Sequence, residues 1–374
     1  TILSMQRTLL VTMDFYPAVG GVSNYWLALS ERIDPSRWVV LAPPLQKSVS
    51  EHKSSIRIIR RRFFSSLLFP RWLPLVFSLF SVVRKERIEL IIVGQTLPVG
   101  TAVRIVSLLT SIPYIVSTHG MDITLSLSHP RKKLLSSWIL SGAEKVITIS
   151  AYTARVLGRY GISGKKICFV QPCPRITPAS LAPTSAHAAP TRSPIILTVA
   201  RLVRRKGHDT VISALPEIIK KFPSCLYAII GEGGERGRLE ERVRELRLEE
   251  HVLFLGLLSD EHTAWWYQHS SVFVMTPTDE GGDVEGFGLV YLEAGSFGKP
   301  VIASDTGGVP DAVLDGVTGI VIPQESPERC ARALKKILAD PVLAHRMGSA
   351  ARSRIEREFS WDLQAKKLKH CIDD

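Results

Sequence analysis

The sequence is poor in cysteine, and its cysteines do not group. Cys168, Cys173, Cys225, Cys330 and Cys371 are scattered and odd in number, and none forms a Cys-x-x-Cys pair. Disulfide frameworks use paired cysteines and zinc sites use closely spaced ones, so the sequence disfavours both kinds of site. We therefore expect a cytoplasmic protein that holds no metal.

Long hydrophobic runs are also missing. The longest, from Trp72 to Val83, contains Pro74 and falls short of the roughly 18 residues that a membrane span needs. The chain does not open on a basic segment followed by an apolar stretch and a small-residue cleavage site. We expect neither a transmembrane helix nor a secretion signal.

Acidic residues are scarce in the first half of the chain. The 374 residues carry a formal net charge of +12. Residues 1–190 hold 23 Lys and Arg against 8 Asp and Glu, a balance of +15, whereas residues 191–374 hold 24 against 27, a balance of −3. A basic half attracts anionic lipid headgroups, nucleic acids or phosphorylated substrates; a solvated basic surface without a partner is the alternative.

The chain does contain a repeated alternation of short apolar runs and helical patterns. The runs include TLLVTMDFY, ELIIVGQ and PYIVSTHG in the first half, and PIILTVARL, CLYAIIGEG and SVFVMTP in the second. Continuous apolar strands separated by helices are typical of parallel sheets covered on both faces. The expected fold class is therefore α/β, with two Rossmann-like domains that face a central cleft, where ligands bind beyond the carboxyl ends of the strands.

Two glycine-rich turns follow predicted strands. Gly20 and Gly21 precede an amphipathic helix, without the GxGxxG fingerprint of dinucleotide-binding proteins. Gly231 opens the segment GEGGERGRLEERV after another strand. Glycines let backbone N–H groups approach an anion at a helix N-terminus, so each turn is either a phosphate-binding loop or a plain tight turn.

A basic turn, ARLVRRKG, follows the strand PIILTV. It places Arg201, Arg204, Arg205 and Lys206 at the carboxyl end of that strand. Arginine offers a planar fork for phosphate oxygens and lysine a compact charge, so we expect this turn to bind a diphosphate. A solvated basic turn is the alternative.

The most informative segment is TDEGGDVEGFGLVYLEAGSFGKPVIASDTGGVPD, residues 278–311. Glu285 and Glu293 flank a Gly-Phe-Gly loop at 286–288 and the start of an apolar helix at Leu289. The carboxylates can accept hydrogen bonds from sugar hydroxyls while the helix N-terminus faces phosphate. The alternative is that an acid only caps the helix and that Glu293 is buried with a fixed protein partner. Such a partner is expected because an unpaired acid among apolar residues is costly.

His119 lies in the segment STHGMD, at the end of the strand PYIVSTHG. A lone histidine more often has a structural role. Beside the other motifs, it is the candidate in the first domain for contact with a bound sugar.

Together these motifs resemble glycosyltransferase family 4, the retaining enzymes of GT-B fold, over nearly the whole chain. The most specific part is Glu-x7-Glu in EGFGLVYLE with KPVIASDTGGVPDAVLDGVTGIVIP after it, and DVEGFGLVYLEA is similar to phosphatidylinositol mannosyltransferases and related α-mannosyltransferases. The resemblance implies transfer of a hexose, mannose from GDP-mannose or another sugar from a UDP-sugar, onto a lipid-linked or oligosaccharide acceptor. It implies no metal and no cofactor besides this nucleotide-sugar co-substrate.

The resemblance also implies roles for particular residues. His119 would bind the 6-hydroxyl of the sugar, Glu285 its other hydroxyls, and Arg201 with Lys206 the diphosphate, so these four would act in catalysis. Glu293 would bind the ribose. The nucleotide-sugar site would comprise Gly20, Gly21, Arg201, Lys206, Gly231, Glu285, Gly286, Phe287, Gly288, Leu289 and Glu293.

The expected domains follow from the two series of strands and helices and from the aperiodic stretch rich in Pro, Ser, Thr and Ala between them, and the packing of the last helix follows from the resemblance. Residues 1–175 would form the N-terminal acceptor-binding domain, 176–193 a linker and 194–358 the C-terminal nucleotide-sugar-binding domain. Residues 359–374 would form a helix that packs back on the N-terminal domain.

A basic and aromatic stretch in the first domain suits contact with an anionic membrane. The stretch contains Arg57, Arg60, Arg61, Arg62, Phe63, Phe64, Leu67, Leu68, Phe69, Arg71, Trp72 and Leu73. Basic residues beside exposed aromatics favour an interfacial contact, and a strand with solvated arginines before a core helix is the alternative. We expect peripheral binding at the inner face of the cell membrane; the sequence does not set the oligomeric state.

Other functions remain open at this point. One is a glucosyl-, galactosyl- or GlcNAc-transferase that uses a UDP-sugar. A nucleotide-sugar epimerase would need a further acid/base set in the cleft, and none stands out. A nucleic-acid-binding protein would leave Glu285 and Glu293 without a role, so we expect no nucleic-acid partner.

Overall fold

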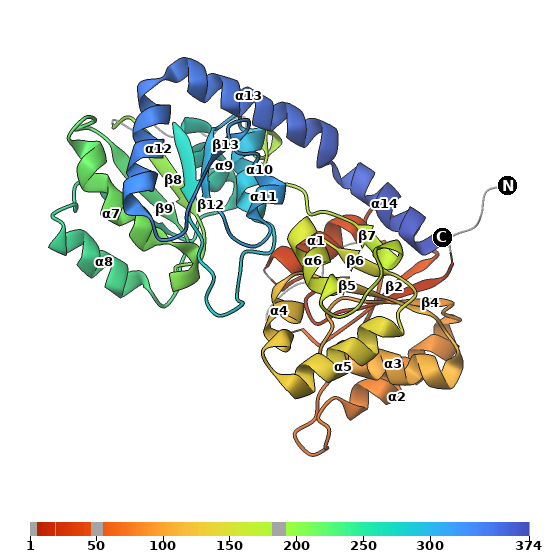
Figure 1. Cartoon of the computed structure of the whole chain (residues 1–374). Coiled ribbons are helices and arrows are strands. Elements are labelled where there is room, and N and C mark those ends of the chain that lie inside the picture. The colour runs from red at the N-terminus through yellow and green to blue at the C-terminus, as the bar shows by residue number, and fades with distance from the viewer. Residues whose placement is uncertain (1–5, 19, 46–54, 182–191, 374) are drawn as a thin grey trace. The chain divides into compact units, whose positions relative to one another are not determined.

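The computed structural model describes residues 6–18, 20–45, 55–181 and 192–373 (Figure 1). They fall into two compact units. Unit 1 comprises the described residues of 1–172 and 360–374, and unit 2 comprises those of 173–359. The linker expected over 176–193 lies partly outside the described residues, which omit 182–191.

Unit 1 is built on a seven-stranded sheet in the order β3-β2-β1-β4-β5-β6-β7, with every neighbouring pair parallel. All residues of the five strands between the two edges are buried, as expected for strands covered on both faces. The strands are β1 (Thr8–Val11), β2 (Trp38–Ala42), β3 (Arg57–Arg60), β4 (Leu90–Val93), β5 (Tyr114–Thr118), β6 (Val146–Thr148) and β7 (Ile167–Phe169).

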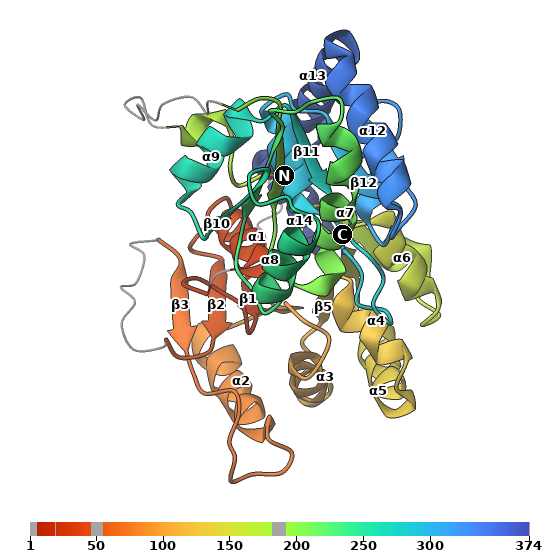
Figure 2. The same ribbon diagram turned by 90° about the vertical axis from the view of Figure 1, so that its left-hand side faces the viewer.

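Helices cover this sheet on both faces. They are α1 (Gly21–Ser30), α2 (Leu73–Glu86), α3 (Val99–Thr110), α4 (Met121–Leu127), α5 (Pro130–Ser141), α6 (Ala151–Gly158) and α14 (Trp361–Asp373), with a 3-10 turn η1 (Gly164–Lys166). Apolar residues of α2, α3, α5 and α6 form one core with the strands, and α2, α3 and α5 lie side by side in Figure 2. Helix α14 packs on α1 and on the edge strand β7.

The opposite edge strand, β3, carries arginine at both ends. Arg57 forms an ion pair at 2.6 Å with Glu86, a buried residue of α2 that also pairs with Arg7 at 3.3 Å. Burial tends to raise the pKa of Glu86, but the two arginines hold it below its ordinary value. Arg60 donates to the carbonyl oxygens of Pro43 and Tyr16. The arginines therefore fasten this edge to its neighbours.

Unit 2 has a six-stranded sheet in the order β10-β9-β8-β11-β12-β13, again with parallel pairs. Its strands are β8 (Ile195–Val199), β9 (Leu226–Ile230), β10 (Val252–Gly256), β11 (Val272–Met275), β12 (Val301–Ser304) and β13 (Gly319–Ile322). Its helices are α7 (His208–Ile219), α8 (Arg236–Glu245), α9 (Asp260–His269), α10 (Leu289–Ser296), α11 (Val309–Ala312), α12 (Pro327–Ala339) and α13 (Pro341–Glu358), with 3-10 turns η2 (Pro178–Ser180) and η3 (Arg204–Lys206).

The strand orders confirm the prediction of two Rossmann-like α/β domains. In each sheet the order reverses at one place, between β1 and β4 in unit 1 and between β8 and β11 in unit 2. Loops that follow the two strands at such a place diverge, and ligands bind beyond the carboxyl ends of those strands. The predicted site residues lie in these loops, in those of neighbouring strands and in the helices that follow the loops. Across the described parts of the chain, no helix combines the length and apolar character that a bilayer span requires.

Helix α14 is fastened to unit 1 by a buried glutamine. Oε1 of Gln364 accepts a hydrogen bond from the backbone N–H of Gln171 at 2.8 Å, and Gln364 is fully buried. Two residues earlier, Asp362 pairs at 2.9 Å with Arg32, which lies just after α1. The Asp362 carboxylate is largely exposed, so the glutamine makes the larger contribution.

We expect Gln364→Leu to lower the free energy of unfolding of unit 1 by about 1–2 kcal/mol, because it removes the acceptor of a part-buried N–H group. Urea denaturation followed by tryptophan fluorescence measures the change. Lys366→Leu, at an exposed position of the same helix, should change it by less than about 0.5 kcal/mol. Equal effects of the two substitutions would contradict the assigned role of Gln364.

Candidate functional site

The basic turn after β8 and the acidic loop after β11 meet at the carboxyl ends of these strands. Oε2 of Glu285 accepts a hydrogen bond from Nη1 of Arg205 at 3.0 Å and another from Nζ of Lys206. Nε of Arg205 also pairs with Asp283 at 3.1 Å. The structure thus brings together two predicted site residues, Glu285 and Lys206, and adds Arg205 to them.

Burial and charge act against each other in this cluster. The side chains of Arg205, Lys206 and Glu285 are only 10–13% exposed. Burial tends to raise the pKa of Glu285, but Lys206 and Arg205 outweigh it and hold that pKa below its ordinary value. Burial lowers the pKa of Lys206, against the opposite effect of Glu285. Glu285 is therefore an ionised carboxylate at neutral pH.

One oxygen of Glu285 is left for a ligand. Both cations bind Oε2, and no hydrogen-bond partner among the described residues reaches Oε1. The side chain of Glu285 keeps 13% of its surface exposed. An ionised carboxylate accepts hydrogen bonds at both oxygens. Oε1 can therefore receive hydroxyl groups while Oε2 is held.

Arg201, the predicted partner of Lys206, lies outside the ion-paired cluster. Its side chain is exposed, and its backbone carbonyl bonds with Nε2 of His208 at 3.2 Å. Arg205 was missed as a site residue although it stands in the same motif. The signal for it was the doublet Arg204–Arg205, but only the conformation of η3 shows which arginine turns inward.

Two glycines hold the loops of the cluster against each other. Gly207 has φ +71°, and a Cβ there would lie 1.8 Å from the carbonyl oxygen of Thr276. Gly307 has φ +54°, and a Cβ there would lie 2.2 Å from the carbonyl oxygen of Glu285. Side chains at these positions would force the loops apart. In the sequence these glycines stand in the motifs RRKG and DTGG, which mark both loops.

The loop at 286–288 contributes backbone rather than side chains. Phe287 is 2% exposed, and its ring packs on Phe359 with centroids 5.8 Å apart. Gly288 has φ +90° and precedes Leu289, the first residue of α10. No acceptor among the described residues meets the N–H of Leu289. A helix N-terminus with such a group suits an anion.

Glu293 is held by the protein. Its Oε2 accepts a hydrogen bond from the hydroxyl of Tyr267 at 3.0 Å, and its Oε1 accepts one from the N–H of Ile176 at 3.4 Å. Glu293 is 5% exposed, and burial raises its pKa above the ordinary value although Arg175 opposes the shift. The fixed partner that the sequence left as an alternative is therefore present, and a role on the ribose stays a prediction.

Gly231 is placed by packing at the carboxyl end of β9. Its φ is +142°, and a Cβ there would lie 1.9 Å from the carbonyl oxygen of Ala200, in the basic turn. Its N–H donates to the carbonyl of Gly256 at 2.8 Å. This glycine therefore lets two loops pack closely, and a contact with phosphate stays a prediction.

The remaining predicted residues belong to unit 1. The backbone N–H of His119 donates to Asp122 at 3.0 Å, and its Nε2 lies 3.3 Å from Oγ of Ser117. Burial lowers the pKa of His119, although Asp122 and Asp14 oppose the shift. His119 is therefore neutral at pH 7 and can exchange hydrogen bonds with a hydroxyl.

Gly20 precedes α1, and both Gly20 and Gly21 are exposed. A Cβ at Gly20 would meet nothing within 4 Å in the described chain. The described structure therefore gives no steric reason for glycine at this position. The predicted site residues thus form two groups, one in each unit.

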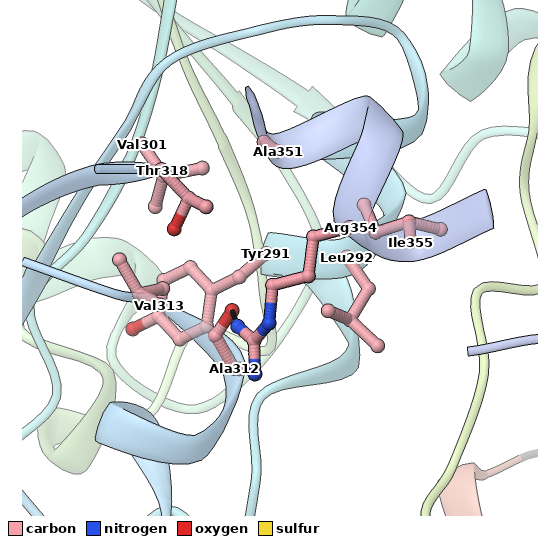
Figure 3. A pocket seen from close by; sticks show the side chains of 9 residues that line it. All are labelled: Tyr291, Leu292, Val301, Ala312, Val313, Thr318, Ala351, Arg354 and Ile355. Atoms are coloured by element: carbon pink, nitrogen blue, oxygen red, sulfur yellow. Dashed lines mark hydrogen bonds between the residues drawn. The ribbon is translucent and has the colours of Figure 1, made fainter. Parts of the chain in front are cut away.

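A small pocket beside α10 is lined by none of the predicted site residues (Figure 3). Arg354 of α13 reaches across it and donates to the carbonyls of Ala312 at 3.0 Å and Asp311 at 2.7 Å. The arginine ties α13 to α11, so this pocket belongs to the packing that supports α10.

Two family models match the chain. The model described as Glycosyltransferase Family 4 matches residues 19–173, and the model described as Glycosyl transferases group 1 matches residues 184–354.

Relatives match over nearly the full length. A GDP-mannose-dependent alpha-(1-6)-phosphatidylinositol monomannoside mannosyltransferase of Mycolicibacterium smegmatis is 30% identical over 380 residues, 97% of each chain. A GDP-mannose-dependent monoacylated alpha-(1-6)-phosphatidylinositol monomannoside mannosyltransferase of Corynebacterium glutamicum is 28% identical over 392 residues, 98% of each chain.

Solved structures share the fold. Sucrose-phosphate synthase of Thermosynechococcus elongatus has a TM-score of 0.81 at 24% identity, with 98% of each chain covered. HepE of Anabaena in complex with UDP and glucose has a TM-score of 0.79 at 18% identity, again with 98% of each chain covered. Identities this low carry the likeness of fold and nothing more.

We expect the stability of unit 2 to fall below about pH 6.5, the ordinary pKa of histidine. Burial lowers the pKa of His208 to about 4, so the unfolded chain binds a proton that the folded chain does not. The stabilisation is complete above pH 6.5, and about 3 kcal/mol of it is lost between pH 6.5 and pH 4.

Urea denaturation over this pH range measures the slope of the free energy of unfolding against pH, for the wild type and for His208→Leu. The variant should lose less stability as the pH falls. His345→Leu, at an exposed position, is the control and should keep the wild-type slope. A wild-type slope in His208→Leu would contradict the prediction.

Proposed function

Because the chain belongs to glycosyltransferase family 4, we propose that it transfers mannose from GDP-mannose to a phosphatidylinositol mannoside or a related lipid-linked acceptor. The chain is a hexosyltransferase of GT-B fold. The named substrates of its full-length relatives support the choice of nucleotide sugar and acceptor. With the family established, the epimerase and nucleic-acid alternatives are set aside.

The observation that carries the proposal is the open oxygen of Glu285. No described residue donates to Oε1, while Oε2 binds Arg205 and Lys206. A carboxylate fixed by one oxygen can bind sugar hydroxyls through the other without losing its orientation. Glu285 would therefore hold the transferred sugar directly beside two cations.

The diphosphate would lie against the basic turn and the start of α10. Lys206 and the exposed Arg201 would neutralise its charge, and the N–H of Leu289 would donate to it. When the bond between the anomeric carbon and the phosphate oxygen breaks, negative charge grows on the departing phosphate. Cations already in place stabilise that charge without reorganisation.

Retention of the anomeric configuration follows if the acceptor hydroxyl attacks from the face that the diphosphate leaves. Its proton would pass to the departing phosphate oxygen, so no side-chain base is needed. Neutral His119 would bind a hydroxyl of the sugar from unit 1.

A screen of nucleotide sugars tests the proposed function. Binding and transfer to a phosphatidylinositol mannoside are measured with GDP-mannose, UDP-glucose, UDP-GlcNAc and UDP-galactose. We expect GDP-mannose to bind and to support transfer. Transfer from a UDP-sugar alone would overturn the assignment of mannose.

We expect Lys206→Met to lower kcat/KM by at least about 100-fold, because it removes a cation preorganised for the leaving diphosphate. The fold should persist, since Arg205 still pairs with Glu285. Steady-state transfer from GDP-mannose measures the effect. The control is Arg204→Met in the same turn, whose side chain is 78% exposed and which should change the rate by less than about twofold. Normal turnover in Lys206→Met would refute the role of this turn.

Membrane contact is proposed for the loop before α2. This loop projects from the body of unit 1 (Figures 1 and 2), and it contains Leu67, which is 92% exposed, and Phe69, which is 96% exposed. Arg61, Arg62 and Arg71 beside them are exposed as well. Exposed apolar side chains next to cations fit the surface of an anionic bilayer.

We expect the double substitution of Leu67→Ser and Phe69→Ser to weaken binding to anionic liposomes by at least about tenfold, because it removes the apolar contacts that enter the bilayer. Liposome sedimentation measures the binding, with neutral lipid for comparison. Leu257→Ser, which changes a 79% exposed leucine of unit 2, is the control and should have no effect. Equally weak binding of the wild type to anionic and neutral lipid would contradict the proposed membrane contact.

A further inference from the structure

Arg201 is a cation of the basic turn whose side chain is not set by an ion pair. Arg205 and Lys206 are held by Glu285, whereas no described residue pairs with the guanidinium of Arg201, and its side chain is exposed. An exposed arginine loses rotamer freedom when it binds a ligand, so its affinity depends on how well its backbone orients it beforehand. The contacts of that backbone therefore bear on ligand binding.

Main-chain hydrogen bonds hold the residues on both sides of Arg201. The N–H of Ala200 donates to the carbonyl of Ile230 at 2.9 Å. The N–H of Leu202 donates to the carbonyl of Glu232, also at 2.9 Å. These bonds extend the pairing of β8 with β9 beyond the two strands. They fix the neighbours of Arg201, and its own carbonyl group is held by other contacts.

The carbonyl of Arg201 is held by a buried histidine, His208, at the start of α7. The carbonyl oxygen accepts a hydrogen bond from the N–H of Val203 at 2.9 Å, and Nε2 of His208 lies 3.2 Å from it. A carbonyl group only accepts, so Nε2 carries the proton of the neutral ring. Both lone pairs of the oxygen are then used, one within the turn and one by the histidine.

The surroundings of His208 give it no second hydrogen bond. The residue is 2% exposed, and its Nδ1 is buried without a hydrogen-bond partner in the described chain. Burial of such a nitrogen is unfavourable, and an apolar side chain would avoid it. Filling of space therefore does not explain a histidine at this position, whereas its bond to the Arg201 carbonyl does.

His208 can hold the turn because its own backbone is fixed. The carbonyl of Gly207, the residue before it, accepts a hydrogen bond from Oγ1 of Thr276 at 2.9 Å. Helix α7 packs along α12 in the core of unit 2. The histidine thus connects Arg201 to the packed interior rather than to another exposed loop, and packed interiors deform little.

We propose that His208 is a positioning residue that orients Arg201 toward the diphosphate through the Arg201 carbonyl. The inference rests on the proposed function, because it takes Arg201 to bind the diphosphate of the nucleotide sugar. Without the imidazole N–H, the carbonyl keeps only its bond within the turn. The peptide group can then rotate and change the direction of the arginine side chain. Supporting hydrogen bonds of this kind keep binding groups in their productive geometry.

A double-mutant cycle on GDP binding tests the inference. Isothermal titration calorimetry gives the Kd for GDP of the wild type, His208→Leu, Arg201→Met and the protein with both substitutions. Each single substitution should weaken binding about fivefold or more. The doubly substituted protein should bind GDP within about twofold of Arg201→Met, because His208 acts through Arg201. A histidine needed only for packing would weaken binding equally in both backgrounds.

Two polar replacements test the same bond if His208→Leu does not fold. The amide nitrogen of His208→Gln can take the place of Nε2, so this variant should keep the Kd for GDP within about twofold of the wild type. The amide of His208→Asn lies near the position of Nδ1, which meets no described partner, so binding should weaken about fivefold or more.

The matched control is His251→Leu, which also breaks a bond between a histidine and a carbonyl. Nδ1 of His251 lies 3.0 Å from the carbonyl oxygen of Cys225, and these residues precede β10 and β9. They are at the amino ends of the strands, away from the basic turn at the carboxyl ends. His251→Leu should therefore bind GDP as the wild type does.

The outcomes separate the two proposals. Wild-type affinity for GDP in Arg201→Met, or in folded His208→Leu and His208→Asn, would overturn the positioning role and leave the GDP-mannose assignment intact. Equal losses from His208→Leu with and without Arg201, or equal losses in His208→Gln and His208→Asn, would also overturn it. Failure of the wild type to bind GDP would overturn the GDP-mannose assignment and the positioning role with it.

Discussion

The site in unit 2 depends on one buried carboxylate that is shared by two cations. Moving Arg205, Lys206 and Glu285 out of water costs several kcal/mol for each ion, and close pairing has to offset that cost. The backbone keeps the pairing in register, since the N–H of Thr278 donates to the carbonyl of Arg205 and the N–H of Gly308 to that of Glu285. The two cations and the carboxylate are therefore in position before any ligand arrives, as the proposed binding of a diphosphate and a sugar requires.

Much of the fold could be predicted because the sequence patterns that mark its strands are local. Buried strands such as β1 and β4 are continuous apolar runs, and the carboxyl ends of such strands in one parallel sheet share an edge. The structure places Glu285 and Lys206 in contact at such an edge, and their roles stay a prediction. Local sequence does not show whether Arg201 or Arg205 joins the ion-paired cluster. The answer depends on the conformation of the turn η3 and on Asp283, which follows β11. Glu293 finds its partner at Ile176, which is far away in the sequence.

Helix α10 combines tasks that are usually divided among several elements. Its N-terminus follows the loop that places Glu285, its interior carries Glu293, and α13 packs along it. Every residue from Tyr291 to Ser296 is buried. Such a helix has little freedom to adjust locally, so a displacement at either end also displaces the residues packed against it. The same packing that fixes the ions also makes the segment a stiff link.

The two edge strands of the unit 1 sheet, β3 and β7, are protected from pairing with other strands in different ways. At one side α14 packs on β7, and at the other β3 begins and ends with arginine. An uncovered strand is a template for pairing with another polypeptide, and charged residues along it make that pairing unfavourable. The arginines at the two ends of β3 therefore disfavour edge-to-edge association between copies of the protein.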